Sequence, residues 1–199
     1  MPSKNIIKTY VPHNYYHVYN RGVNKEPIFL ENDDKQYLLN LIYNRSGFES
    51  SSVNVRENRS NKNLLGKSEI LSFCLMNNHY HFLFWLDKNP AAIKTFMQNV
   101  FTAYSLYFNK KYNRIGPLFQ SRYKASRIDS DPYLLHISRY IHLNPSNFED
   151  HPYSSYQNYL GKNIHKFIKP DRILELFKNS NYEKFVLDGL NESDDFNLF

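Results

Sequence analysis

Two histidines one residue apart, His79 and His81, are the residues whose types and spacing point most directly to chemistry. They begin a strongly β-forming run, and successive side chains of a strand alternate between its faces, so both imidazoles point the same way. Two neutral imidazoles on a rigid strand can bind one cation and leave its other positions to further groups. The pair therefore indicates a metal site, with two half-buried structural histidines as the alternative.

A second pair of side chains that could take part in chemistry lies about sixty residues later, on a predicted helix. Asp129 or Ser130 can cap this helix, and Asn144 followed by proline ends it. Tyr140 and Asn144 are four residues apart, so their side chains lie one turn above the other on the same helical face. A phenol and an amide oxygen are therefore expected to project together.

The elements that must position these groups follow from hydrophobic periodicity and from turn residues. Their order is β-α-β-β-α-β followed by a helix, which is the order of the split βαβ plan. We therefore predict an α+β fold with a ferredoxin-like antiparallel sheet, helices on one face and a C-terminal helical tail. The expected strands are 15–22, 69–76, 79–86 and an extended segment at 118–128, and the expected helices run from 32 or 33 to about 45 and from 90 to about 112.

A chain of 199 residues fits one domain with an appendage. We place the domain at 10–145 and include in it a long polar loop at 46–68, with a short strand near Val53. Residues 146–199 form the tail, which we expect to carry short helices, to dock on the domain and to fray at its end.

Charge is distributed unevenly along the chain. Residues 1–145 hold 19 Lys and Arg against 10 Asp and Glu, whereas residues 146–199 hold six against nine. The excess of positive charge in residues 1–145, in a chain with 17 Tyr and 15 Phe, suits binding of a nucleic acid. Cationic side chains bind phosphates, and aromatic rings stack on unpaired bases. Alternation along 118–128 places Arg122 and Lys124 on one face, which makes them candidates for phosphate contacts, and Arg21 and Arg127 are assigned to nucleic acid with them.

Other classes of protein are disfavoured by simple counts. Cys74 is the single cysteine, so neither an internal disulfide nor a thiolate metal cage is available. No apolar run approaches 18 residues and the opening residues lack the apolar region of a signal peptide. We therefore expect a cytoplasmic protein with no membrane partner.

Two motifs of this chain resemble those of a known enzyme family. The run Asn78-His79-Tyr80-His81 resembles the His-hydrophobic-His motif that names the HUH superfamily, and Tyr140-Ile141-His142-Leu143-Asn144-Pro145 resembles its nucleophile helix. The chain thus resembles the single-tyrosine HUH transposases of the IS200-like kind, and within them the REP-associated tyrosine transposases of bacteria. Segments 15–21, 116–125 and 153–160 share this resemblance, which covers about 10–160.

The resemblance implies an endonuclease and strand transferase that acts on single-stranded DNA folded into hairpins. It implies a divalent cation, Mg²⁺ or Mn²⁺, and a 5′-phosphotyrosine intermediate. Carried over residue by residue, His79, His81 and Asn144 are metal ligands and Tyr140 is the nucleophile. The protein would act as a monomer or a homodimer.

Two other functions remain compatible with these residues. A rolling-circle replication initiator or relaxase shares the histidine pair and the tyrosine. A non-catalytic module would use the same sheet to bind single-stranded DNA or RNA through Arg122, Lys124 and aromatic side chains, without metal and without a covalent adduct.

Overall fold

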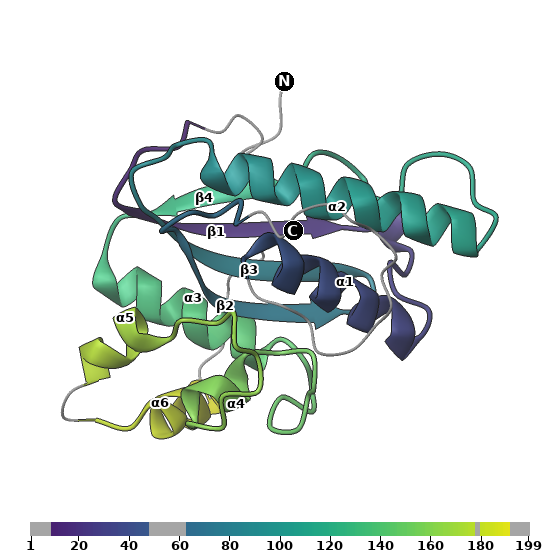
Figure 1. The fold of residues 1–199 in the computed structure, drawn as a ribbon. Helices are drawn as coiled ribbons and strands as arrows, with labels where there is room; N and C mark the ends of the chain where they lie inside the picture. The colour runs from purple at the N-terminus through teal and green to yellow at the C-terminus, as the bar shows by residue number, and fades with distance from the viewer. Residues whose placement is uncertain (1–8, 48–62, 178–179, 192–199) are drawn as a thin grey trace.

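Strand β3 (His79–Leu86) lies inside a four-stranded antiparallel sheet with the order β2-β3-β1-β4 (Figure 1). The computed structural model describes residues 9–47, 63–177 and 180–191. A two-residue turn at Asn77 and Asn78 connects β2 (Glu69–Met76) to β3, as expected for a tight hairpin. On its other side β3 pairs with β1 (Asn14–Arg21), and β4 (Lys124–Ile128) pairs with the outer edge of β1.

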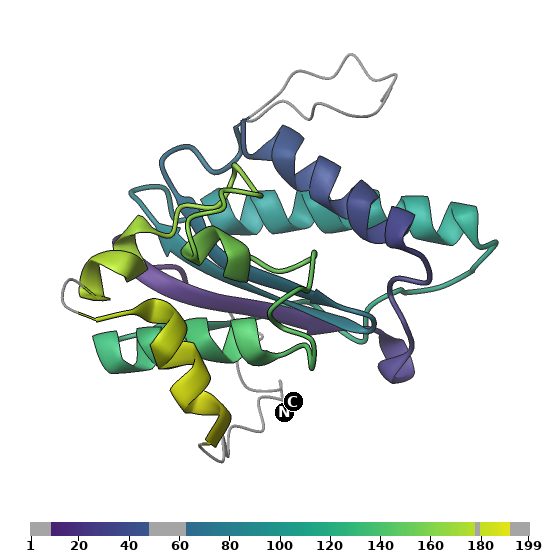
Figure 2. The ribbon, with the colours of Figure 1, turned by 90° about the horizontal axis from the view of Figure 1, so that it is seen from below.

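Helices cover both faces of this sheet (Figure 2). The helices α1 (Asn32–Arg45) and α2 (Ala92–Lys111) pack on one face over an aromatic core that includes Phe82 and Phe84. On the opposite face, α3 (Asp131–Leu143) buries Ile137 and Ile141 against Leu83. The alternation of β3 therefore sends its even-numbered side chains under α1 and α2, and its odd-numbered side chains, the two histidines among them, toward α3.

The C-terminal segment packs against α3. Its short helices are α4 (Tyr156–Tyr159), α5 (Asp171–Leu174) and α6 (Tyr182–Asp188), with 3₁₀ turns at Val23–Lys25, Glu175–Phe177 and Gly189–Asn191 completing the described elements. Buried His142 of α3 binds the Tyr182 hydroxyl through Nδ1 at 2.7 Å and the Ser155 hydroxyl through Nε2 at 2.8 Å. The division into a domain at 10–145 and a tail at 146–199 stays a prediction.

The predicted fold class is confirmed, because the sheet is antiparallel, follows the split βαβ order and carries α1 and α2 on one face. Two details of the predicted elements were wrong. The N-cap of α1 is Glu31, which forms a capping box with Asp34, rather than Asn32 or Asp33. The fourth strand begins at Lys124 rather than near 118. Most of the predicted polar loop at 46–68, including the short strand near Val53, lies outside the described residues.

An irregularity between β1 and the chain before β4 explains the shorter fourth strand. Tyr19 pairs with Lys124, whereas Gly22 pairs with Phe119, so five residue steps on one segment match only three on the other. The surplus residues bulge out of the ladder, as happens wherever one strand carries more residues than its partner. Alternation of side chains therefore does not extend from β4 back to Arg122.

The layer of α1 and α2 is tied together by a buried carboxylate. Asp34 is fully buried, accepts hydrogen bonds from the backbone N–H groups of Leu30 and Glu31, and contacts Lys111 Nζ at 2.8 Å and the Tyr112 hydroxyl at 2.8 Å. Burial by itself would raise the pKa of Asp34, but the hydrogen bonds from Lys111, Tyr112 and the backbone outweigh it and hold the pKa below its ordinary value.

Asp34→Asn is expected to lower the free energy of unfolding at pH 7 by about 2–3 kcal/mol, because Lys111 loses the buried one of its two charged partners and the side-chain donors around position 34 meet a weaker acceptor. The melting temperature should fall by about 5–10 °C. The pKa of Asp34 is lower in the folded protein than in the unfolded protein, where it is about 4. The carboxylate therefore stabilises the fold fully above the unfolded pKa, and this stabilisation disappears as the pH falls through the folded pKa.

The difference in melting temperature between parent and Asp34→Asn should therefore shrink below about pH 4. Asp33, the neighbour of Asp34, is exposed, so Asp33→Asn provides a matched control. Its free energy of unfolding should stay within about 0.5 kcal/mol of that of the parent. A loss of equal size at pH 3 and pH 7 would show that the carboxylate charge is not what stabilises this layer.

Candidate active site

The histidine pair lies on the side of the sheet that α3 covers. His81 is fully buried and His79 is half-buried, and their ring centroids are 5.2 Å apart with planes at 87°. Neither imidazole points into the core beneath α1 and α2, where Tyr80 and Phe82 lie instead. The rigid, paired position of β3 inside the sheet thus presents both rings to α3, as the alternation of the strand predicts.

Asn144, the C-cap of α3, reaches one of these histidines. Its Oδ1 lies 2.9 Å from His79 Nε2, and the other ring nitrogen of His79, Nδ1, lies 2.7 Å from Asn78 Oδ1. Burial lowers the pKa of His79, the Asn144 hydrogen bond offsets part of this effect, and the positive charge of nearby Arg21 lowers the pKa a little further. His79 is therefore neutral at pH 7, the form that can coordinate a cation.

Tyr140 lies one helical turn before Asn144 and faces the second histidine. Its ring centroid is 5.3 Å from that of His81 with the planes perpendicular. Burial raises the pKa of Tyr140, and the Asn144 hydrogen bond and the charge of Arg21 offset only part of this rise. At pH 7 the group is thus a phenol that must lose its proton when it attacks.

His17 is a member of the site that the sequence reasoning missed. It lies on β1, is fully buried, and its Nε2 is 2.9 Å from His81 Nδ1. Burial lowers the pKa of His17 to about 3, so the ring is neutral at physiological pH. Position 17 lies on the same strand face as Tyr15 and Tyr19, but the sequence contains no sign that this face joins β3 beside His81.

These groups include donors of the kinds that could hold a single divalent cation. Ligand atoms about 2.1 Å from an ion and at right angles to each other lie roughly 3 Å apart, which agrees with the 2.9 Å between His79 Nε2 and Asn144 Oδ1. Because His81 Nδ1 faces His17, a cation would bind His81 through Nε2. Among the described residues no group of three or more His, Cys, Asp or Glu is arranged to hold a metal, so this candidate centre depends on the amide oxygen as third donor.

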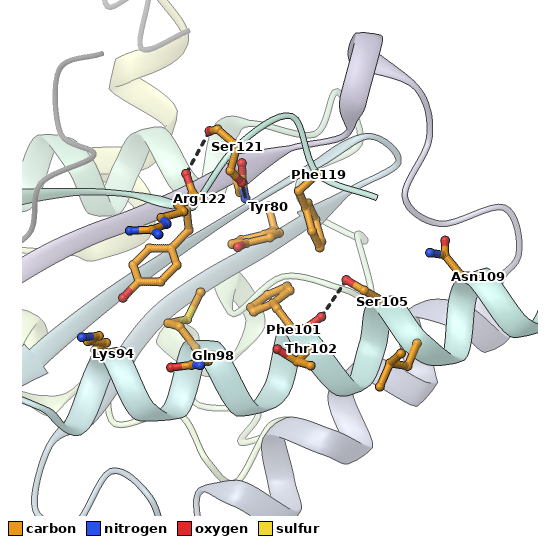
Figure 3. Close-up of a pocket in the computed structure, with 14 residues that line it drawn as sticks. Tyr80, Lys94, Gln98, Phe101, Thr102, Ser105, Asn109, Phe119, Ser121 and Arg122 are labelled. Atoms are coloured by element: carbon orange, nitrogen blue, oxygen red, sulfur yellow. Dashed lines mark hydrogen bonds between the residues drawn. The ribbon is translucent and has the colours of Figure 1, made fainter. Parts of the chain in front are cut away.

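The predicted phosphate-binding residues do not share one face. Arg21 pairs with His79 on the neighbouring strand, and Lys124 pairs with Tyr19 on the same side of the sheet, with Nζ 5.7 Å from the ring centroid of Tyr19. Arg122 lies instead on the α2 side, where it lines a pocket of about 880 Å³ with aromatic residues such as Tyr80 and Phe101 (Figure 3). The prediction that Arg122 and Lys124 share one face was wrong, because the bulge before β4 breaks the alternation. Arg127, exposed on β4, alternates to the side opposite Lys124.

Comparison with known protein families shows which family the chain belongs to. Residues 10–144 match the family described as "Transposase IS200 like". The chain belongs to the IS200-like transposase family. The matched range of this IS200-like transposase contains β1 to β4 and α3, and with them both histidines of β3, Tyr140 and Asn144. Membership of this family makes the protein a transposase.

The IS200-like transposase also resembles a solved structure, that of a REP-associated tyrosine transposase bound to a REP hairpin. The two agree with a TM-score of 0.58 and 14% sequence identity, over 81% of this chain and 88% of that chain. At this identity the likeness establishes the fold alone. A comparison with curated proteins found no match. Within the described ranges of the IS200-like transposase, no helix combines the length and apolar character needed to cross a bilayer.

Proposed function

We propose that this IS200-like transposase is a metal-dependent endonuclease and strand transferase for single-stranded DNA that folds into hairpins. The observation that carries the proposal is the convergence of Tyr140 and Asn144 from α3 with His79 and His81 from β3 on one side of the sheet. A phenol beside two imidazoles and an amide oxygen supplies a nucleophile together with donors for a divalent cation.

The proposed reaction exchanges one phosphodiester for another. Tyr140 Oη attacks the scissile phosphorus, and the bond from phosphorus to the 3′ oxygen of the preceding nucleotide breaks. The phenolic proton is lost to solvent, the departing 3′ oxygen takes up a proton, and the 5′ phosphate remains bound to Tyr140. A 3′ hydroxyl can later attack this phosphotyrosine and release Tyr140, so the bond energy is conserved for rejoining.

In this proposal His79, His81 and Asn144 hold Mg²⁺ or Mn²⁺, which when bound polarises the scissile phosphate. Asn144 contacts both His79 and the Tyr140 hydroxyl, so it keeps the nucleophile next to the donor set. Arg21 offsets a small part of the rise that burial causes in the pKa of Tyr140, and it provides a positive charge on the side of the sheet that the scissile phosphate would approach.

The proposed partner is a DNA hairpin with single-stranded flanks. The solved protein of similar fold is bound to a REP hairpin. In this chain, Arg21 and Lys124 place positive charge beside the candidate active site, and Tyr19 provides an aromatic ring there.

A labelled hairpin oligonucleotide tests the proposed function directly. Purified protein with Mg²⁺ or Mn²⁺ should nick one flank and form a protein–DNA adduct that survives boiling in detergent, whereas excess EDTA should abolish both products. Hairpin binding without nicking or adduct would instead assign the chain to the non-catalytic binding modules. Nicking of a plasmid replication origin in preference to a free hairpin would favour a replication initiator.

Salt dependence of binding tests the basic residues. Lys124→Ala should reduce the slope of log K against log salt concentration by about 0.7 for one lost phosphate contact with a single strand. We propose that the strand also passes over the edge strand β4 to the α2 side of the sheet, so Arg122→Ala should produce a similar change.

Lys110 is exposed at the C-terminal end of α2, and Lys110→Ala is the matched control for removal of a surface charge. Its slope should equal that of the parent. An unchanged slope for Lys124→Ala would make Lys124 an ordinary solvated charge.

A further inference from the structure

The neighbour of His81 on β1 is a second imidazole. His17 and His81 are both fully buried, and their rings are nearly parallel, with centroids 5.1 Å apart and an interplanar angle of 16°. His17 also stacks on Tyr19 with centroids 4.9 Å apart, and its ring meets that of Tyr140 edge to face at 6.3 Å. Packing from β1, β3 and α3 thus holds the His17 ring in one orientation.

A hydrogen bond between two neutral imidazoles requires an N–H on one ring and a lone pair on the other. His17 Nε2 and His81 Nδ1 are 2.9 Å apart, so one of them carries the proton between the rings. If the proton is on His17 Nε2, then His81 is protonated at Nε2 and cannot coordinate through that atom. If the proton is on His81 Nδ1, then His81 Nε2 has a lone pair for a cation.

We infer that His17 is a positioning residue of the candidate metal centre: its Nε2 accepts the Nδ1 proton of His81 and fixes His81 with Nε2 toward the cation. This inference rests on the proposed function, because that proposal makes His81 a ligand. A neighbour that accepts the second N–H of a ligand histidine fixes both the tautomer and the ring orientation. Here the acceptor is an imidazole.

Burial makes this contact hard to replace. Both rings are inaccessible to solvent, so bulk water cannot serve as the acceptor when His17 is removed. Within the described residues His17 Nδ1 has no hydrogen-bond partner, so the contact with His81 is the one polar contact of the His17 ring there. The ring therefore contributes to the site through His81.

Two substitutions separate this role from simple packing. His17→Leu fills the space but provides no acceptor, whereas His17→Gln can place an amide oxygen near the position of Nε2. Mn²⁺ affinity of the purified protein, measured by titration without DNA, should fall by about 10–100-fold in His17→Leu and largely recover in His17→Gln. His165→Leu removes another buried histidine, on the α1 side of the sheet beside Phe73 and Phe167, and should leave Mn²⁺ affinity unchanged.

The tautomers can be read in the unaltered protein. Long-range ¹H–¹⁵N correlation of ¹⁵N-histidine-labelled protein with saturating Mg²⁺ should show His81 protonated at Nδ1 and His17 unprotonated at Nε2. In His17→Leu, His81 should no longer be held in this single tautomer. A Mg²⁺-loaded parent with the proton on His17 Nε2 would overturn the inference, even if no substituted protein folded.

The outcomes distinguish this inference from the proposed function. A parent and a folded His17→Leu that bind Mn²⁺ within about twofold of each other would contradict the role of His17 and leave the nuclease proposal intact. Loss of Mn²⁺ affinity in His17→Leu, without any DNA adduct in the parent, would support the role of His17 and reject the nuclease. A parent that binds no Mn²⁺ would overturn both.

Discussion

Tyr140→Phe is expected to abolish both cleavage of a hairpin oligonucleotide and the detergent-resistant protein–DNA adduct. The substitution removes one oxygen and keeps the ring that packs against His81. An ordinary hydrogen bond of the hydroxyl contributes about 1 kcal/mol, so folding and hairpin binding should persist. Adduct formation by the parent should depend on Mg²⁺ or Mn²⁺ and be measured on a denaturing gel with labelled DNA.

Tyr133 is the matched control for Tyr140, because it is a partly buried tyrosine on the same helix, two turns earlier. Tyr133→Phe should form the adduct at the parental rate. Should Tyr140→Phe still form an adduct, the nucleophile is another residue, and mapping the DNA-linked peptide would identify it.

His79→Ala is expected to reduce cleavage at a fixed, subsaturating Mn²⁺ concentration by a factor on the order of 10²–10³. A metal ion supplies several kcal/mol of charge stabilisation in such reactions, and about 1.4 kcal/mol corresponds to a factor of ten. The substitution also removes the 2.9 Å contact with Asn144. Higher Mn²⁺ concentrations should restore part of the rate, because His81 and Asn144 remain.

Hairpin affinity measured without metal should be the same for His79→Ala and the parent, since the imidazole is not among the proposed phosphate contacts. His151 is also half-buried and hydrogen-bonded, to the Leu75 carbonyl at 3.1 Å, so His151→Ala controls for loss of a partly buried imidazole. Equal Mn²⁺ dependence of cleavage in His79→Ala and the parent would exclude His79 as a ligand.

Much of the fold was predictable because its signals are local. Residues 69–86 are β-forming and largely apolar with a two-residue break at Asn77 and Asn78, and they form a hairpin as predicted. The four-residue spacing of Tyr140 and Asn144 places both side chains on one side of α3 through helix geometry alone. Such patterns depend on backbone periodicity, which does not change with the surrounding structure.

The bulge before β4 shows where local patterns stop being sufficient. Alternation along 118–128 predicts a common face for Arg122 and Lys124, but Tyr19 of β1 pairs with Lys124 in one register and Gly22, just after β1, pairs with Phe119 in another. Register depends on how two distant segments fit together around the core, and a local pattern in one segment contains no information about its partner. Arg122 consequently lines the pocket beside α2.

The sequence by itself determined that His79 and His81 point one way and that Tyr140 and Asn144 share a helical face, because both follow from the repeat of a strand or helix. Only the tertiary structure decided that α3 crosses the histidine face of the sheet, that Asn144 reaches His79, and that His17 meets His81. These contacts join residues more than sixty positions apart in the chain. They arise from the pairing of β1 with β3 and from burial of the apolar side of α3 against the sheet, which are long-range packing choices.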